Sequence, residues 1–136
     1  MNQFSTVLIV DDDEITRFLL TAKLESLTFA NQYQAYENAV EALHFLEKHK
    51  HIAQELPDLI LLDLNMPEMN GWEFLEMYKN IVSVFPKKIH MCILSSSVFE
   101  KDMERAQAHP LVEEYLVKPV QKEALEELAR KYAQEC

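Results

Sequence analysis

Side chains that can hold a cation or receive a phosphoryl group follow several short aliphatic runs of the sequence. Asp11–Asp13 follow the first of these runs, Asp63 follows a later one, and Ser95 and Lys118 follow two others. If the runs are parallel strands of one sheet, their carboxyl ends meet along one edge, where open sheets bind their ligands. The sequence therefore predicts that carboxylates, a hydroxyl and an amine gather at one site.

The charge expected at this site favours a divalent cation. Asp11, Asp12 and Asp63 supply three negative charges and Lys118 supplies one positive charge, so one divalent ion brings the sum to zero. Without a cation, the neighbouring carboxylates raise the pKa of Asp63. Hard carboxylate oxygens that leave room for water suit Mg²⁺. We therefore expect a Mg²⁺ site.

An ionised aspartate in such a site can accept a phosphoryl group directly. Asp63 needs no general base to act as a nucleophile. Lys118 and the cation would neutralise charge on the transferred group, and Ser95 would contact one of its oxygens. Taken singly, Asp11–Asp13 can also be a helix cap and Asp63 a turn residue. Their convergence on one sheet edge favours the phosphoryl-accepting site.

Five short runs rich in β-branched and aliphatic residues predict five strands. They are Thr6–Val10, Gln32–Tyr36, Leu59–Leu62, Ile89–Leu94 and Glu114–Val117. Helical patterns lie between the runs, which indicates a parallel sheet covered by helices on both faces. Gln32–Tyr36 is the least apolar run and suits a sheet edge. The 136 residues therefore predict one α/β domain, a (βα)5 doubly wound sandwich.

The segments between the runs carry helix caps and apolar faces. The expected helices are Glu14–Ser26, one that starts at Asn38, Trp72–Phe85, Glu100–Ala108, and one between Val120 and the C-terminus. Asp13 is placed to cap the first helix, and Asn38 with Glu41 forms a capping-box pattern at the second. The first helix has apolar residues on one face, namely Ile15, Phe18, Leu19 and Ala22.

The composition argues against several classes of protein. Thirteen basic and 23 acidic residues give a net charge of −10, which disfavours binding to nucleic acid or to an anionic membrane. The single glycine leaves no glycine-rich phosphate loop. The two cysteines do not resemble a secreted disulfide framework, and no apolar run suits a signal peptide or a membrane span. We therefore expect a cytoplasmic protein.

Four motifs, in this order, resemble the receiver domain of two-component response regulators. They are VLIVDD at 7–12, PDLILLDLNMPEMNG at 57–71, ILSS at 93–96 and YLVKP at 115–119. Each motif is modest evidence alone, but the set is specific, and the resemblance covers roughly residues 4–134. It implies a five-stranded parallel sheet of order 2-1-3-4-5, as in flavodoxin and CheY.

The resemblance implies a role for each residue of the acidic site. Asp63 is similar to the phosphoacceptor of the family. Asp12, Asp63 and the backbone carbonyl of Asn65 are similar to the direct Mg²⁺ ligands, and Asp11 to the residue that holds the ion through water. Lys118 is similar to the lysine that binds the phosphoryl group.

Other positions resemble the switch and tuning residues of the family. Ser95 and Tyr115 are similar to the hydroxyl and aromatic residues that change position after phosphorylation. Asn65 and Ser97 match two variable positions that tune the lifetime of the phosphoaspartate. Pro119 matches a proline whose preceding peptide bond is usually cis.

By this resemblance, we expect a stand-alone receiver over residues 1–136, without an output domain, that acts as a switch and not as a turnover enzyme. A histidine kinase or phosphotransfer protein would donate the phosphoryl group. A downstream protein, or a second copy in a homodimer, would bind the face of the fourth helix, fifth strand and fifth helix. The stretch 108–114 lacks the glycine-containing turn common in the family, which leaves the path of the fourth helix open.

Two alternatives belong to other functional classes. The acidic start at Asp11–Asp13 nearly fits the nucleophilic motif of haloacid-dehalogenase-like phosphatases, although only 18 residues follow Lys118 where that fold needs more acidic ligands. The other alternative is a receiver-shaped scaffold that never accepts phosphate. The intact set of acceptor, acid pair, hydroxyl and lysine argues against it.

Overall fold

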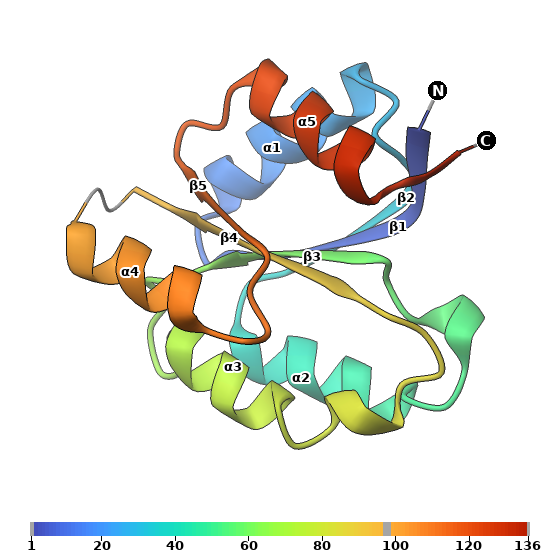
Figure 1. Cartoon of the computed structure of the whole chain (residues 1–136), viewed down its shortest axis with the longest axis vertical. Helices are drawn as coiled ribbons and strands as arrows, with labels where there is room; N and C mark the ends of the chain where they lie inside the picture. Colours follow the sequence, from blue (N-terminus) through green and yellow to red (C-terminus); the bar gives the residue numbers. More distant parts are fainter. Residues whose placement is uncertain (1, 97–98, 136) are drawn as a thin grey trace.

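Strands and helices alternate along the chain in the computed structural model, which describes residues 2–96 and 99–135 (Figure 1). The strands are β1 (Asn2–Val10), β2 (Ala30–Tyr36), β3 (Leu59–Asp63), β4 (His90–Ser95), β5 (Glu114–Val117) and β6 (Gln134–Glu135). The α-helices are α1 (Glu14–Ser26), α2 (Ala39–Lys48), α3 (Gly71–Tyr78), α4 (Glu100–Ala108) and α5 (Lys122–Tyr132). Two 3₁₀ helices, η1 (Ala53–Glu55) and η2 (Val82–Val84), lie in the connections.

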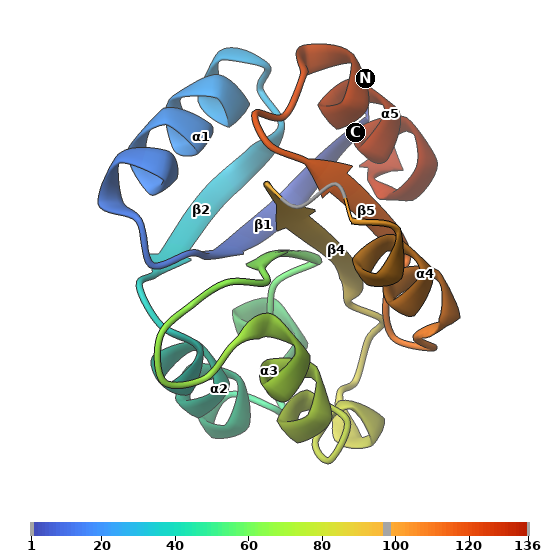
Figure 2. The ribbon, with the colours of Figure 1, turned by 90° about the vertical axis from the view of Figure 1, so that its left-hand side faces the viewer.

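The main sheet has the predicted order β2–β1–β3–β4–β5, and these strands are all parallel. The register places Val10 opposite Leu62, and Asp63 opposite Leu94. Figures 1 and 2 show α1 and α5 on one face of the sheet and α2 and α3 on the other, with α4 beside β5. The fold class predicted from the sequence is confirmed, and the carboxyl ends of the central strands meet at one edge.

Several strands differ from their predicted bounds. β1 begins at Asn2, earlier than predicted, and its first residues pair antiparallel with β6, which was not predicted because two residues carry no readable pattern. β3 and β4 each extend one residue further than predicted. Asp63 and Ser95 are therefore the last residues of their strands, held by sheet hydrogen bonds, and do not lie in the loops that follow.

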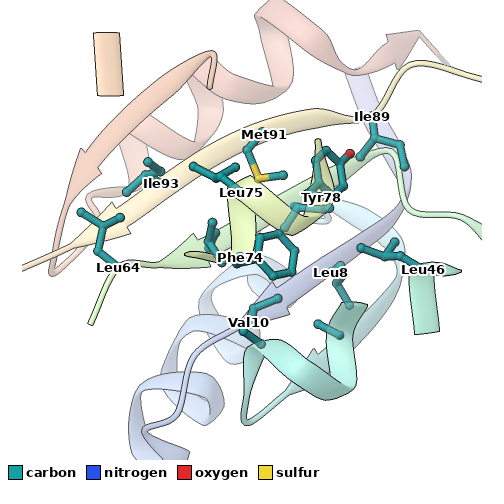
Figure 3. Packing of buried hydrophobic residues seen from close by; sticks show 14 of the residues in the cluster. Leu8, Val10, Leu46, Leu64, Phe74, Leu75, Tyr78, Ile89, Met91 and Ile93 are labelled. Carbon is teal, nitrogen blue, oxygen red and sulfur yellow. The ribbon is translucent and has the colours of Figure 1, made fainter. Parts of the chain in front are cut away.

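Alternate residues of the central strands supply two separate hydrophobic cores. Leu8 and Val10 belong to a cluster with residues of α2 and α3 (Figure 3), which also includes Ala106 of α4. Val7 and Ile9 pack with residues of α1 and α5 on the opposite face. Because helices cover both faces, the stretches Val7–Val10, Leu59–Leu62 and Met91–Leu94 of the central strands are apolar and show no polar alternation.

The first helix has the predicted bounds and cap, but its apolar face is exposed. Asp13 accepts a hydrogen bond from the backbone N–H of Thr16, as a cap should. The side chains buried in the core are Leu20 and Leu24. Ile15, Phe18 and Leu19 are 67%, 71% and 59% exposed. The apolar spacing in α1 therefore marks a surface that the rest of the chain leaves uncovered.

The third helix is shorter than the apolar spacing predicts. It begins at Gly71 with a reciprocal capping box between Asn70 and Glu73, and it ends at Tyr78 instead of Phe85. After Tyr78 the chain continues through tighter turns, in which the N–H of Ile81 bonds to the carbonyl of Tyr78. The later apolar residues still pack against the core from η2 and its flanks. The prediction of a helix through Phe85 was wrong because these turns keep apolar residues on the same face.

The path of α4, which the sequence left open, places this helix against β5 and near the start of α3. Ala106 is the buried residue within the described span Glu100–Ala108. The guanidinium carbon of Arg105 lies 4.3 Å from the centre of a Trp72 ring, a cation–π contact between α4 and α3. Among the described residues, no helix is long and apolar enough to cross a membrane.

Replacing Tyr78 by Phe is expected to raise the free energy of unfolding by about 1 kcal/mol. Tyr78 is 1% exposed, and its hydroxyl has no hydrogen-bond partner among the described residues (Figure 3). Tyr33 is the matched control, because its hydroxyl accepts from Ala30 N–H at 2.9 Å and donates to Leu24 O at 3.1 Å. Urea unfolding should show Tyr33→Phe losing stability. Equal losses in both variants would contradict this account.

Thr28→Gly should also stabilise the fold, by about 1 kcal/mol. Thr28 follows α1 with φ of 53°, a left-handed conformation that a β-branched residue adopts at a cost. Ser26→Gly is the control: Ser26 lies in the last turn of α1, where glycine weakens the helix. Thermal unfolding should move in opposite directions for the two variants, and a lower melting temperature for Thr28→Gly would disprove the strain.

Candidate functional site

Three carboxylates converge at the carboxyl edge of the sheet. Asp11 follows β1 and Asp63 ends the neighbouring strand β3. One carboxylate oxygen from each of Asp11, Asp12 and Asp63 lies within 4.8 Å of the others. Asp11 and Asp63 are 2% and 5% exposed, whereas Asp12 faces solvent. The topology thus brings together the acidic residues that the sequence singled out.

Lys118 directly follows β5, the edge strand of the sheet, and its side chain reaches the same cluster. Its Nζ lies 2.6 Å from Oδ2 of Asp11 and 3.1 Å from Oδ1 of Asp63. The backbone N–H of Lys118 also donates to the carbonyl of Ser95 at 2.8 Å, which fixes where the side chain starts. The Lys118–Pro119 peptide bond is cis, as the resemblance implied. One amine therefore bridges the two buried carboxylates.

The positive charge of Lys118 does not fully offset the burial and mutual repulsion of the carboxylates. Burial, and then the charge of Asp11, raise the pKa of Asp63 from 3.8 to about 6, although Lys118 opposes the rise. For Lys118, burial alone would lower the pKa, but the hydrogen bonds and charges of Asp11 and Asp63 outweigh it and raise the pKa. A cation at this edge would relieve the repulsion between the carboxylates.

The donor set fits a hard divalent cation. Asp11, Asp12 and Asp63 offer only carboxylate oxygens, and the exposed position of Asp12 leaves room for water, which Mg²⁺ retains when it binds proteins. Asn65 is exposed two residues beyond β3, and its backbone N–H lowers the pKa of the Asp63 carboxylate. The predicted ligand role of the Asn65 carbonyl stays a prediction.

The predicted switch residues lie on the two neighbouring strands. Ser95 ends β4 and is fully buried. Tyr115 lies in β5 opposite Ile93 and packs, half-buried, against the core on the α2–α3 face. Ser97, a predicted tuning residue, lies outside the described residues. The structure thus brings the acid cluster and Lys118 into direct contact, while the roles of Ser95, Tyr115, Asn65 and Ser97 stay predictions.

Two residues that support the site were not singled out for this role from the sequence. Arg17 donates from Nη1 to the backbone carbonyl of Asp11 at 2.7 Å, and Asp11 Oδ1 accepts from the N–H of Asp13 at 2.9 Å. The spacing of Arg17 with Leu20 and Leu24 places it on the sheet-facing side of α1, a signal that was available.

Gly71 is the second of these residues. Its N–H donates to the carbonyl of Leu64 at 2.9 Å, and a Cβ added here would lie 2.8 Å from the carbonyl oxygen of Asp63. The single glycine of the chain therefore stands where the start of α3 touches the end of β3. Its rarity in the composition was the available signal.

Comparisons with known proteins agree with this geometry. Residues 7–130 match the family model of the response regulator receiver domain. A two-component response regulator from Cytophaga hutchinsonii has a similar structure, with a TM-score of 0.87, 32% identity, and coverage of 96% of this chain and 97% of that one.

Two relatives found by sequence are longer than this chain, one slightly and one greatly. The chain is 29% identical to the probable methanogenesis regulatory protein FilR2 of Methanothrix harundinacea, over 88% of this chain and 75% of that protein. It is 36% identical to the autoinducer 1 sensor kinase/phosphatase LuxN of Vibrio harveyi, over 91% of this chain but only 13% of that protein. The similarity therefore concerns one domain, which occurs in proteins of different size.

Proposed function

The chain belongs to the response regulator receiver domain family, which has a role in two-component signalling, and we propose that Asp63 accepts a phosphoryl group in a Mg²⁺-dependent reaction. The contact that carries this proposal is the bridge from Lys118 to both Asp11 and Asp63. It places a cation beside the nucleophilic carboxylate, inside a cluster of carboxylates that can hold a divalent ion.

The chain's own groups supply most of this chemistry. When bound, Mg²⁺ would lower the pKa of Asp63 and neutralise charge on the phosphoryl oxygens. An Asp63 oxygen forms the new bond to phosphorus as the bond from phosphorus to the donor breaks, and the donor keeps that electron pair. Lys118 Nζ, 3.1 Å from Asp63 Oδ1, is placed to hold a phosphoryl oxygen. The Ser95 hydroxyl, at the end of the adjacent strand, would donate to another.

The proposed donor is a histidine kinase or a histidine phosphotransfer protein, and the proposed output is a change in protein contacts. Ser95 and Tyr115 would move as a pair after phosphorylation, and Asn65 would tune the lifetime of the phosphoaspartate. The surface of α4 and β5 suits partner binding, because Phe99 and Met103 are 74% and 36% exposed. A downstream protein or a second copy of the chain would bind there, in the cytoplasm.

Incubation with acetyl phosphate and Mg²⁺ tests the proposal directly. Intact mass spectrometry should show one added phosphoryl group, and chelation of Mg²⁺ should prevent it. Asp63→Asn should remove the labelling. Asp58→Asn is the matched control, because Asp58 precedes β3 at its opposite end and pairs with Lys87 at 2.8 Å.

Three outcomes would overturn the proposal. An unchanged mass would favour a receiver-shaped scaffold, and equal labelling of Asp63→Asn would exclude Asp63 as the acceptor. Repeated release of phosphate that survives Asp63→Asn but is lost in Asp11→Asn would favour a phosphatase of the haloacid-dehalogenase type.

A further inference from the structure

A pocket of about 400 Å³ opens next to the acceptor site, between α1 and the segment that follows β5. Its volume lies within the range of about 300–1,000 Å³ typical of small-molecule sites. The apolar part of its wall is formed by Leu19, Leu20, Leu94, Pro119 and Val120. Leu19 is 59% exposed although it lines this pocket, so its side chain is available to a ligand.

Lys118 connects this pocket to the carboxylate cluster. It lines the pocket, and its Nζ contacts Asp63 Oδ1 at 3.1 Å. Asp63 is 5% exposed, so a phosphoryl donor must approach from the open edge of the sheet, where Ser96 and Pro119 also line the pocket. Lys118 therefore brings the pocket and the Asp63 carboxylate next to each other.

Lysine side chains line the pocket beside its apolar wall. Lys23 and Lys118 both line it, although the chain as a whole carries a net charge of −10. Lys23 Nζ lies 2.7 Å from the carbonyl of Val120, which keeps this ammonium at the pocket wall. Lys23 beside an aliphatic lining complements an aromatic carboxylate better than it complements acetate, because the aromatic ring can replace water on the apolar wall.

We propose that this pocket binds the leaving group of aromatic acyl phosphates, which makes them faster phosphoryl donors to Asp63 than acetyl phosphate. The inference rests on the proposed function and names a substrate class for that site. In the step, an Asp63 oxygen forms a bond to phosphorus as the acyl oxygen–phosphorus bond breaks. The carboxylate leaves with the electron pair into the pocket, and no proton is transferred.

Labelling rates with two donors test this inference. Benzoyl phosphate and acetyl phosphate release carboxylates of similar basicity, so their rates should be similar without the pocket. With the wild-type chain and Mg²⁺, intact mass spectrometry should show labelling by benzoyl phosphate about tenfold faster. In Leu19→Ser this ratio should fall severalfold, while the rate with acetyl phosphate stays unchanged.

Phe18→Ser is the matched control for Leu19→Ser. Phe18 is the preceding residue, is 71% exposed and does not line the pocket, so this variant should keep the wild-type ratio of rates. Methyl NMR gives a readout without phosphorylation. Benzoate should shift the Leu19 and Val120 methyl signals of the wild type, and acetate at the same concentration should not.

The possible failures are distinguishable. Labelling by both donors at equal rates, or a ratio that Leu19→Ser leaves unchanged, would overturn the inference and leave the proposed function intact. The absence of labelling with either donor would overturn the proposed function itself, and the substrate class with it.

Discussion

Asp63→Asn should make the metal-free protein more stable by about 3 kcal/mol at pH 8, although it removes the proposed phosphoacceptor. Burial and the charge of Asp11 raise the pKa of Asp63 from 3.8 to about 6 in the native state. The ionised carboxylate is therefore destabilised by folding, and Asn keeps nearly the same shape without the charge. At this position the ionised carboxylate that the proposed function requires lowers the stability of the fold.

The pH dependence of this effect has a defined sign. Between pH 3.8 and about 6, Asp63 is more fully protonated in the native state than in the unfolded chain. The stability of the fold that depends on protonated Asp63 is therefore fully present below pH 3.8, and it is lost as the pH rises through about 6. The difference between Asp63→Asn and wild type should grow from about 0.5 kcal/mol at pH 4 to about 3 kcal/mol at pH 8.

Urea unfolding in the presence of a chelator measures this difference. Asp58→Asn should have the opposite sign, because the Asp58 carboxylate accepts from the N–H groups of Ser5 and Thr6 and pairs with Lys87. Added Mg²⁺ should stabilise the wild type and so reduce the difference in unfolding free energy between the wild type and Asp63→Asn. A gap of equal size at pH 4 and pH 8 would show that the charge of Asp63 is not its cause.

Gly71→Ala is expected to lower the free energy of unfolding by about 3 kcal/mol and to slow phosphorylation. An added Cβ would lie 2.8 Å from the Asp63 carbonyl oxygen and 2.9 Å from the Leu64 Cα, and both of these atoms belong to the backbone. A flexible side chain could move aside, but here α3 must shift away from the end of β3. The loss should exceed the gain of about 1 kcal/mol that alanine brings to a helix.

Glu76→Ala is the control that separates the steric effect of the added Cβ at Gly71 from the effect of placing an alanine in α3. Glu76 lies on the same helix with its side chain 62% exposed, so this variant should change stability by less than about 0.5 kcal/mol. Chemical unfolding and the rate of labelling by acetyl phosphate should both respond to Gly71→Ala. Wild-type values of both would mean that α3 and β3 are not in contact at Gly71.

The acid cluster could be predicted because it depends only on strand ends. Asp11 directly follows β1 and Asp63 ends the neighbouring parallel strand β3, so their side chains meet at the carboxyl edge of the sheet. Lys118 follows the same rule from β5. The local cap of α1 by Asp13 was also predicted, since it involves residues within one turn.

Contacts between elements were harder to predict than the elements themselves. The bond from Arg17 to the Asp11 carbonyl depends on how α1 is placed over the end of β1. The end of α3 at Tyr78 depends on turns that keep the apolar spacing of a helix. For α1, periodicity identified an apolar face, but periodicity does not reveal whether another element covers that face.

The stacking of Arg105 on Trp72 gives the protein an optical reporter of its own. Trp72 is the single tryptophan of the chain, and it directly follows Gly71, which touches the end of β3. Indole emission responds to a nearby positive charge, so withdrawal of Arg105 changes the fluorescence of one known residue. The position of α4 relative to α3 can therefore be followed in real time, at low concentration and without an attached dye.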